Sequence, residues 1–276
     1  MNYKVLITFF SLLILLFGCF NSNSKSYTTV LNDELTSVDS DGKIPFSTTL
    51  THTPTIKYKL EKSELFFAVD TGSVINFLLG SKSVENLVQK EVYSIAKKIK
   101  KQNTLDIRIN FGNEQFLLDP NGVFSSGMKT NPYDGFLGLT YLEQFRNVVF
   151  DYVNKTISFN EEPICDNSLP MYKRDYVWFT TFECNGVKSN AMVDTGCFSV
   201  FINKPNVKAT VGDDEIINVR LGNVECNGIS ILQNKTLVTN ENAKNGMYKN
   251  ENIIGYPCFK DHVIQLDFEH NTFRIK

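Results

Sequence analysis

Histidine and tryptophan are scarce in this sequence, and positive charge is not in excess. The 276 residues include three His and one Trp, and 28 Lys and Arg stand against 30 Asp and Glu, for a net charge of −2. Nucleic-acid binders neutralise phosphates with clustered Lys and Arg, which a near-neutral chain does not supply. The one basic run, at residues 97–101, predicts a solvated face. We therefore expect no nucleic-acid partner.

The signatures of zinc sites and of common nucleophilic hydrolases are absent as well. The sequence holds no Cys-x-x-Cys, no His-Glu-x-x-His and no Gly-x-Ser-x-Gly, and its three His are scattered. Structural and catalytic zinc sites need clustered Cys and His, and α/β-hydrolases need a nucleophile flanked by glycines. The sequence therefore predicts no metal and no cofactor.

A long apolar stretch occurs only at the N-terminus. Val5–Phe17 follows Lys4 and would rise about 20 Å as a helix, which is too short for a hydrocarbon core of about 30 Å. A basic residue, a short apolar stretch and a small residue are typical of a secretory signal. The stretch ends in Leu16-Phe17-Gly18-Cys19, which resembles the lipobox of bacterial lipoproteins. We expect a lipoprotein signal peptide over residues 1–18.

In a lipoprotein of this kind, Cys19 becomes the first residue of the mature chain and carries the lipid. Residues 19–43, rich in Ser, Asn and Thr, would then form a polar tether that holds the protein body off a membrane. The expected location is the bacterial cell envelope, with the body outside the cytoplasm, periplasmic or at the surface. The alternative is a plain signal peptide in which Cys19 has no role.

Five further cysteines are an odd number for a disulfide framework. An oxidising compartment would allow a bond between Cys184 and Cys226, each of which lies in a Glu-Cys-Asn-Gly sequence. The sequence by itself leaves the pairing open. The five are Cys165, Cys184, Cys197, Cys226 and Cys258.

Four sequence landmarks recur in the same order in the two halves of the chain. The first is an apolar pair followed by Asp-Thr-Gly, at Asp70 and at Asp194. The repeat spacing is about 110–124 residues, which indicates one unit used twice in a two-lobe protein. The later landmarks are Gly112-Asn113 with Gly222-Asn223, Gly138 with Gly255, and Phe150-Asp151-Tyr152 with Leu266-Asp267-Phe268.

Each half has the pattern of a mostly β unit. Alternating apolar and polar residues, rich in β-branched and aromatic side chains, predict strands in three stretches of each half. Asn185-Gly186 predicts a hairpin turn, Asn227-Gly228 is a candidate for another, and Ser83–Gln89 predicts a short helix. The predicted strand stretches are 55–69, 106–123 and 148–159, then 176–193, 216–232 and 263–275.

The boundary between the two units is indicated by proline. Residues 161–170 contain Pro163 and Pro170 and predict the linker between lobes. We therefore expect an N-terminal lobe over residues 44–160 and a C-terminal lobe over residues 171–276.

A carboxylate that ends an apolar strand and precedes Thr-Gly is delivered into a crowded turn. Glycine lets another backbone approach closely, and threonine offers a hydroxyl that can bond to a facing loop. Two such turns would place Asp70 and Asp194 side by side. Because like charges this close hold one proton between them, one carboxylate can act as general base toward water and the other as general acid toward a carbonyl oxygen.

These residues resemble the signature of the pepsin and retropepsin clan of aspartic proteases, most closely that of bacterial retropepsin-like lipoproteins in a fused two-lobe form. The signature is two apolar residues before Asp-Thr-Gly and, downstream, two apolar residues before Gly, and each half has both parts. The likeness extends from Ile44 to the C-terminus. It implies an all-β fold with two pseudo-symmetric acid-protease β-barrel lobes and a cleft between them.

The resemblance also implies roles for individual residues. Asp70 and Asp194 would be catalytic, and Thr71 and Thr195 would form crossed hydrogen bonds beneath them. The implied activity is an endopeptidase that works as a monomer on an extended peptide or protein substrate in the interlobe cleft. Supporting positions would be Gly72, Ser73, Gly196 and Cys197 in the turns, with Gly138 and Gly255 in loops packed behind them.

The two copies differ at the residue after the glycine, which is Ser73 in the first and Cys197 in the second. A hydroxyl donates a good hydrogen bond to a neighbouring carboxylate and a thiol a weak one, so we expect Asp194 to hold the shared proton more often. The sequence does not assign the hairpin that covers substrate in this family. The alternative hypothesis is a non-catalytic peptide- or glycan-binding lipoprotein that keeps the fold, and retention of both Asp and both Thr favours the enzyme.

Overall fold

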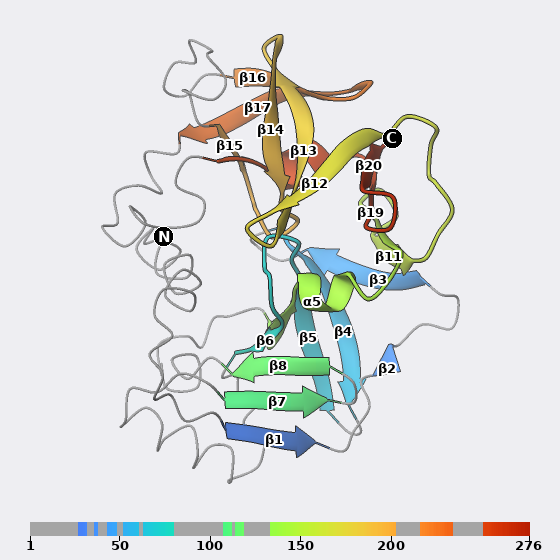
Figure 1. Cartoon of the computed structure of the whole chain (residues 1–276), viewed down its shortest axis with the longest axis vertical. Helices are drawn as coiled ribbons and strands as arrows, with labels where there is room; N and C mark the ends of the chain where they lie inside the picture. The colour runs from blue at the N-terminus through green and yellow to red at the C-terminus, as the bar shows by residue number, and fades with distance from the viewer. Residues whose placement is uncertain are drawn as a thin grey trace.

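The computed structural model of the chain is built almost entirely of β-strands. In the residues it describes there are twenty strands, joined by hydrogen-bonded pairings into one mixed sheet, and two short helices (Figure 1). The predicted all-β class is confirmed. The helix expected over Ser83–Gln89 and the signal segment with Cys19 lie outside the described residues. Those residues are 27–31, 36–37, 43–48, 52–60, 63–79, 107–111, 114–118, 133–202, 216–233 and 251–276.

The first half of the chain starts with three short strands and continues with a repeating unit of eight strands and one helix. The three strands are β1 (Tyr27–Leu31), β2 (Thr36–Ser37) and β3 (Lys43–Thr48). The unit consists of β4 (Pro54–Leu60), β5 (Ser63–Val69), β6 (Phe77–Leu78), β7 (Ile107–Phe111), β8 (Glu114–Leu118), β9 (Gly135–Leu137), α5 (Leu139–Leu142) and β10 (Asn147–Asp151), and it ends with β11 (Thr156–Phe159).

The second half has the same order of elements after one additional strand. The additional strand is β12 (Leu169–Arg174), which begins inside the expected linker. The rest are β13 (Val177–Cys184), β14 (Val187–Val193), β15 (Val200–Ile202), β16 (Ile216–Leu221), β17 (Val224–Gln233), β18 (Asn252–Ile254), α8 (Tyr256–Phe259), β19 (Val263–Asp267) and β20 (Thr272–Ile275).

The two halves also pair their strands in the same way. β5 runs parallel to β9, as β14 runs parallel to β18. β6 is parallel to β8 and antiparallel to β9, and β15 has the same relation to β17 and β18. The hairpins β7–β8 and β16–β17 correspond, as do β10–β11 and β19–β20. The sequence repeat is therefore a repeat of strand pairing.

A shared sheet joins the halves. β10 and β19 lie antiparallel with Asn147 opposite Asp267, and this pair is flanked by β11 and β3 on one side and by β20 and β12 on the other. The edge strand β3 alternates between exposed and buried residues, as expected of a strand with one face on the core. Equivalent strands from each half thus form the base on which both units rest.

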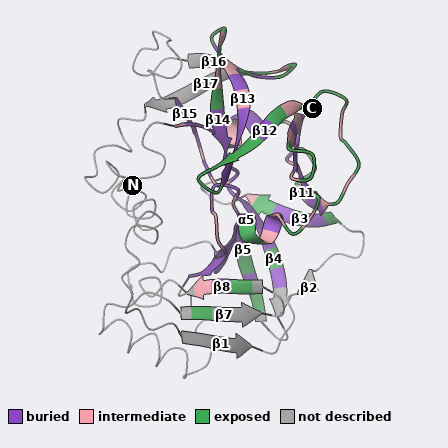
Figure 2. Cartoon of the chain, viewed as in Figure 1, coloured by how far each residue is buried: buried purple, intermediate pink, exposed green. Residues whose placement is uncertain are grey.

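The core lies where the strands of the two units converge. The first residues of β14 alternate between exposed and partly buried side chains. Its last three residues, Ala191–Val193, are completely buried because β13 and β18 flank the strand at that end. Figure 2 shows buried residues gathering toward the middle of the molecule along β4, β5, β13 and β14. The largest fully buried side chains are Phe67, Phe116, Phe150, Phe179, Phe259 and Phe273.

Two turn predictions had different outcomes. Asn185-Gly186 joins β13 to β14 with positive φ at both residues (47° and 81°), which confirms the predicted hairpin turn. The candidate turn at Asn227-Gly228 is wrong, because both residues lie inside β17. The chain reverses earlier, at Gly222-Asn223, where Leu221 pairs with Val224 and leaves a two-residue loop.

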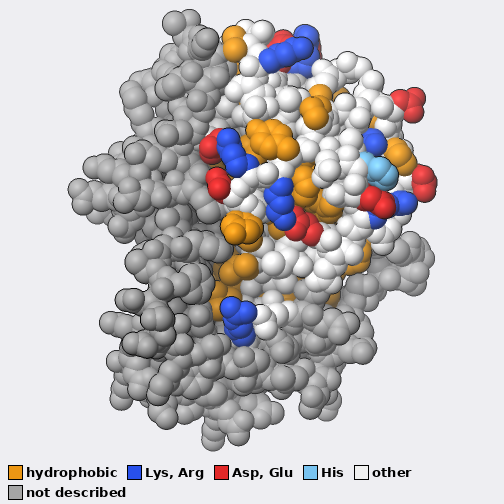
Figure 3. Space-filling model, in the orientation of Figure 1, with side chains coloured by type: hydrophobic (Ala, Val, Ile, Leu, Met, Phe, Trp, Pro, Cys, Tyr) orange, Lys and Arg blue, Asp and Glu red, His pale blue; other side chains and the backbone are white. Residues whose placement is uncertain are grey.

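The described surface is mixed in character. On the face drawn in Figure 3, hydrophobic side chains form separate patches between charged and polar ones. The large hydrophobic residues that are exposed in the described part of the chain are Phe66, Val153, Tyr172 and Tyr176. No helix within the described ranges has the length and apolar character needed to span a bilayer.

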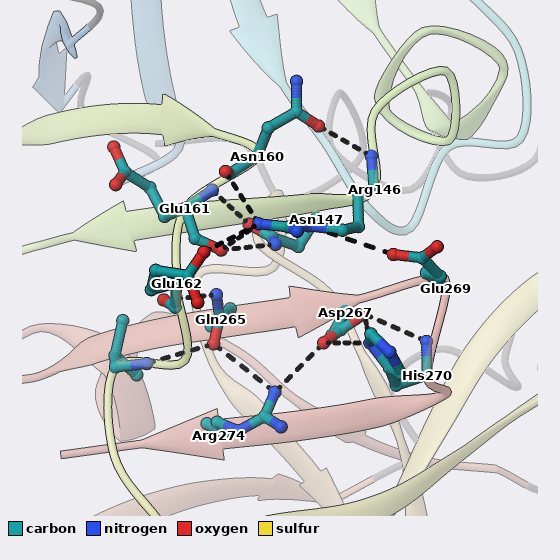
Figure 4. Close-up of polar contacts among 11 residues, drawn as sticks. Arg146, Asn147, Asn160, Glu161, Glu162, Gln265, Asp267, Glu269, His270 and Arg274 are labelled. Carbon is teal, nitrogen blue, oxygen red and sulfur yellow. Dashed lines mark hydrogen bonds and ion pairs between the residues drawn. The ribbon is translucent and has the colours of Figure 1, made fainter.

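Buried polar residues hold the shared sheet to the chain that connects the two halves (Figure 4). Asn147 on β10 donates to the Glu161 carbonyl at 2.8 Å and accepts from the Glu161 N–H at 3.1 Å. Gln265, fully buried on β19, donates to the Glu162 carbonyl at 3.2 Å and accepts from the Ile164 N–H at 3.3 Å. Buried amides thus satisfy backbone groups that no strand pairs.

Asp267 lies at the end of β19 and is buried, while its repeat counterpart Asp151 is half-exposed. Asp267 accepts from the His270 N–H at 3.0 Å and from the Arg274 guanidinium at 3.2 Å. Burial acts to raise the pKa of Asp267, but the hydrogen bonds from His270 and Arg274 outweigh it and the pKa is lowered. Asp151 only caps a turn, through Asn154.

We predict that Asp267→Asn loses about 2 kcal/mol of unfolding free energy at neutral pH, because the charged acceptor of the Arg274 hydrogen bond is removed. A lowered folded-state pKa contributes stability above the unfolded value, and that stability is lost as pH falls below about 4. Urea unfolding at neutral and acid pH should therefore show a gap to the wild type that closes in acid. Asp151→Asn is the control and should lose about 0.5 kcal/mol. An equal loss for both variants would contradict this account of Asp267.

Candidate active site

Asp70 and Asp194 each lie just beyond the end of a buried strand. β5 carries Asp70 past Val69, and the Asp70 N–H donates to the Leu137 carbonyl on β9 at 3.0 Å. β14 carries Asp194, whose N–H donates to the Ile254 carbonyl on β18 at 3.0 Å. The parallel pairings β5–β9 and β14–β18 thus place both carboxylates at equivalent positions.

The two carboxylates meet at the junction of the two units. The Gly72 N–H donates to Asp70 Oδ1 at 2.8 Å, and the Gly196 N–H donates to Asp194 Oδ1 at 2.9 Å. The side chains of Asp70 and Asp194 are in hydrogen-bond contact with each other. A hydrogen bond between two carboxyl groups requires that one of them carries a proton.

The glycines of both turns are required by the opposite carboxylate. A Cβ at Gly72 would lie 2.5 Å from the carboxyl carbon of Asp194, and a Cβ at Gly196 would lie 2.5 Å from that of Asp70. Real Cβ atoms do not come this close to other heavy atoms. Each Asp-Thr-Gly turn therefore leaves room for the aspartate of the other.

The side chains of Thr71 and Thr195 each form hydrogen bonds with the opposite Asp-Thr-Gly turn. Thr71 Oγ1 donates to the Val193 carbonyl at 2.8 Å and accepts from the Thr195 N–H at 3.0 Å. Thr195 Oγ1 donates to the Val69 carbonyl at 2.8 Å and accepts from the Thr71 N–H at 3.0 Å. Both threonines are fully buried, so these four bonds satisfy groups that water does not reach.

Gly138 and Gly255 lie directly against the two turns. A Cβ at Gly138 would lie 2.6 Å from the Ser73 carbonyl oxygen, and one at Gly255 would lie 2.7 Å from that of Ser199. The residues that follow donate to the turns: Leu139 N–H to the Ser73 carbonyl at 2.8 Å, and Tyr256 N–H to the Cys197 carbonyl at 2.9 Å. The downstream apolar-Gly landmark of each half thus packs against the Asp-Thr-Gly landmark of the same half.

Burial raises the pKa of both carboxyls, and repulsion by the other carboxylate adds to this at Asp194. Burial is the main cause of the raised pKa of Asp70, and hydrogen bonds from Asp194 and from the Gly72, Ser73 and Gly196 N–H groups oppose it. Burial also raises the pKa of Asp194, and the negative charge of Asp70 raises it further, well above its ordinary value. The pair therefore keeps one proton toward neutral pH, and the pKa of Asp194 is the one that is raised further.

The expected cause of this asymmetry is wrong. Ser73 Oγ donates to the Ile75 carbonyl at 2.9 Å, and Cys197 Sγ donates to the Ser199 carbonyl at 3.1 Å. Both side chains thus bind a backbone carbonyl two residues on instead of a carboxylate. Because the carboxylates receive backbone N–H groups, replacing the hydroxyl by a thiol does not distinguish Asp70 from Asp194.

The sequence left a bond between Cys184 and Cys226 open, and the structure does not form it. Cys184 on β13 is opposite Val219 on β16, and Val219 is opposite Cys226 on β17. Two strand spacings separate the two cysteines by about 9–10 Å, whereas a disulfide joins Cα atoms less than about 7 Å apart. All five cysteines in the described part of the chain are free thiols.

A group of aromatic and polar residues around the second turn was not foreseen from the sequence. Thr53 Oγ1 donates to the Gly196 carbonyl at 3.3 Å, and His52 stacks on Tyr256 with ring centroids 4.3 Å apart. Tyr152 packs against Tyr256 at 6.1 Å. The only sequence signal was the place of Tyr152 in the fourth landmark, where the second copy has phenylalanine.

Tyr152 carries a buried hydroxyl that has no hydrogen-bond partner among the described residues. Burial raises the pKa of Tyr152 well above its ordinary value, and the charges of Asp194, Tyr256 and Asp70 raise it further. The phenol therefore stays neutral. Because the charges of both aspartates act on the pKa of Tyr152, this residue lies near the carboxylate pair.

Within the described ranges, no three His, Cys, Asp or Glu residues are arranged to hold a metal ion. Two coupled carboxyls with one proton can activate water and protonate an oxygen by themselves.

Comparison with models of known protein families finds no match to this chain, and comparison with curated proteins likewise finds none.

We predict that Thr71→Val loses about 3 kcal/mol of unfolding free energy, because the isosteric side chain leaves the Val193 carbonyl and the Thr195 N–H buried and unpaired. Thr71→Ser is the control: it keeps the hydroxyl and should lose about 1 kcal/mol for the missing methyl. Urea unfolding of both variants measures the difference. Equal stability of the two would mean that the crossed hydrogen bonds contribute nothing net.

We predict that Tyr152→Phe raises the unfolding free energy by about 1 kcal/mol, because it removes a buried hydroxyl without an acceptor. Tyr58→Phe is the matched control, since the Tyr58 hydroxyl bonds to the Tyr141 hydroxyl at 2.8 Å, and it should lose about 1 kcal/mol. Thermal unfolding should move in opposite directions for the two variants. A loss of stability in Tyr152→Phe would show that this hydroxyl is bonded in solution.

Proposed function

We propose that the protein is an aspartic endopeptidase of the retropepsin-like kind, with pseudo-symmetric lobes over residues 44–160 and 171–276 and a substrate cleft between them. The observation that carries the proposal is the pairing of two Asp-Thr-Gly turns, each fixed by the threonine of the other. The equivalent strand pairings of the two halves support the lobes. The substrate is a peptide or protein in extended form.

The raised pKa of Asp194 gives the two carboxyls different roles. Asp70 is the carboxylate and removes a proton from a water molecule as the water oxygen attacks the scissile carbonyl carbon. Asp194 is the acid and donates its proton to the carbonyl oxygen, which forms a neutral tetrahedral intermediate with two hydroxyls.

The intermediate collapses by the reverse use of the same groups. Asp70 passes the proton taken from water to the amide nitrogen, and the carbon–nitrogen bond breaks. Asp194 recovers a proton from one hydroxyl of the intermediate, which becomes the new carboxylic acid. The pair returns to its starting protonation state, so the steps balance without a covalent intermediate.

The proposal includes the location of the enzyme. A lipid on Cys19 would anchor it to a membrane of the bacterial cell envelope, with the body outside the cytoplasm as a monomer. The tether expected over residues 19–43 is shorter in this proposal and ends before Tyr27, because β1 and β2 pair with β7 and β4 of the body. The support is the lipobox-like sequence that ends at Cys19, since this segment lies outside the described residues.

We predict that Asp70→Asn and Asp194→Asn each lower peptide hydrolysis by about three orders of magnitude or more, because the carboxyls act as a unit. Asp151 caps a turn and takes no part in the proposed reaction, so Asp151→Asn should keep wild-type turnover. Hydrolysis of a peptide library is measured for all four proteins, with a statine-type inhibitor as a further control. Wild-type rates in either dyad variant would refute the protease proposal.

The pH profile tests the assignment of acid and base. Both pKa values are raised, so activity should fall in acid as Asp70 gains its proton and fall toward neutral pH as Asp194 loses its proton. The profile is therefore a bell whose limbs both lie above about pH 4. Binding of library peptides with no hydrolysis at any pH would instead favour the non-catalytic binding protein.

A further inference from the structure

Two cysteines in the second half are in contact across adjacent elements. Cys226 lies near the start of β17, and Cys258 lies in α8. Cys226 Sγ donates to the Cys258 carbonyl at 3.4 Å, and the two thiols are also in hydrogen-bond contact with each other. Both residues are buried, Cys258 completely. The two thiols therefore lie in contact at a place that is closed to solvent.

The other cysteines of the described chain are placed differently. Cys197 donates to the Ser199 carbonyl, and Cys165 donates to the Asn167 carbonyl at 3.2 Å. Cys184 lies two strands from Cys226. Among the described residues no three Cys or other ligands could hold a metal ion, so the cysteines of this half do not form a metal site. Cys226 and Cys258 are the pair that geometry brings together.

The two thiols differ in acidity in a way that suits exchange with a disulfide. The hydrogen bond from Cys258 lowers the pKa of Cys226, although burial opposes it. The same hydrogen bond, with burial, raises the pKa of Cys258 well above its ordinary value. Cys226 is therefore the sulfur that ionises first and attacks.

We propose that Cys226 and Cys258 form an intramolecular disulfide that ties β17 to α8 when the chain meets an oxidising thiol–disulfide couple. The Cys226 thiolate attacks one sulfur of an external disulfide and releases one thiolate. Cys258 loses its proton and attacks Cys226 Sγ, which releases the second thiolate. The protein loses two electrons and two protons, and the external disulfide is reduced to two thiols.

The bond would act on the segment behind the second Asp-Thr-Gly turn. Gly255 and Tyr256 precede Cys258 and pack against Cys197, through the Tyr256 N–H to the Cys197 carbonyl. Fixing α8 on β17 would hold that contact in place. The proposal does not rest on the proposed protease activity, because it concerns the cysteine pair alone.

The test is oxidative refolding of the full chain, because the glutathione couple can then reach Cys226 and Cys258 while the fold forms and brings the two residues together. The protein is unfolded in guanidinium, refolded with reduced and oxidised glutathione, alkylated and mapped by mass spectrometry without reduction. We expect a cross-linked peptide pair containing Cys226 and Cys258. Cys226→Ala and Cys258→Ala should each abolish it, while Cys165→Ala and Cys184→Ala should leave it unchanged.

A second measurement covers variants that fail to refold. Thermal unfolding of the oxidised wild type should lie roughly 5–10 °C above that of the protein reduced with dithiothreitol, because the bond restricts the unfolded chain. Full alkylation of Cys226 and Cys258 after oxidative refolding would overturn the proposal. So would a cross-link that joins either residue to Cys184 or Cys197.

Discussion

Two carboxylates in contact repel each other, and the centre of this structure is organised to hold them together. The crossed bonds of Thr71 and Thr195 provide the restraint, because each hydroxyl binds a carbonyl and an N–H of the opposite turn. Neither turn can move without breaking bonds in the other. The halves of the chain meet at this junction and in the shared sheet, and the parallel pairings β5–β9 and β14–β18 bring the two carboxylates to the junction.

The two halves of the chain resemble each other closely in backbone structure and less closely in side chains. Strand pairings, turn hydrogen bonds and glycine contacts are equivalent in the two halves. The side chains around them have diverged: Asp267 is buried against Arg274 where Asp151 only caps a turn, and Tyr152 has a phenylalanine as counterpart. The backbone geometry is the same in the two halves because both carboxylates need the same turn. The neighbouring side chains differ because each only has to pack against the residues of its own half.

The raised pKa of Asp194 has a cause that the sequence did not indicate. The sequence indicated that Asp194 would hold the proton, on the basis of Cys197 against Ser73. In the structure those side chains bind carbonyls of their own turns, and the raised pKa of Asp194 comes from burial and from the charge of Asp70. Burial depends on every element packed around the site, so a comparison of two residue types could not supply it.

The sequence by itself determined the repeat, the all-β class, the Asn185-Gly186 turn and the residues that meet at the centre. Those features depend on local pattern: apolar alternation makes strands, and Asp-Thr-Gly after a buried strand makes a crowded turn. Only the tertiary structure decided which strands pair, where the β16–β17 hairpin reverses, that Tyr152 lies near the carboxylates, and that Cys226 faces Cys258 and not Cys184. Contacts between residues far apart in the chain depend on strand order and register, which a list of residues does not contain.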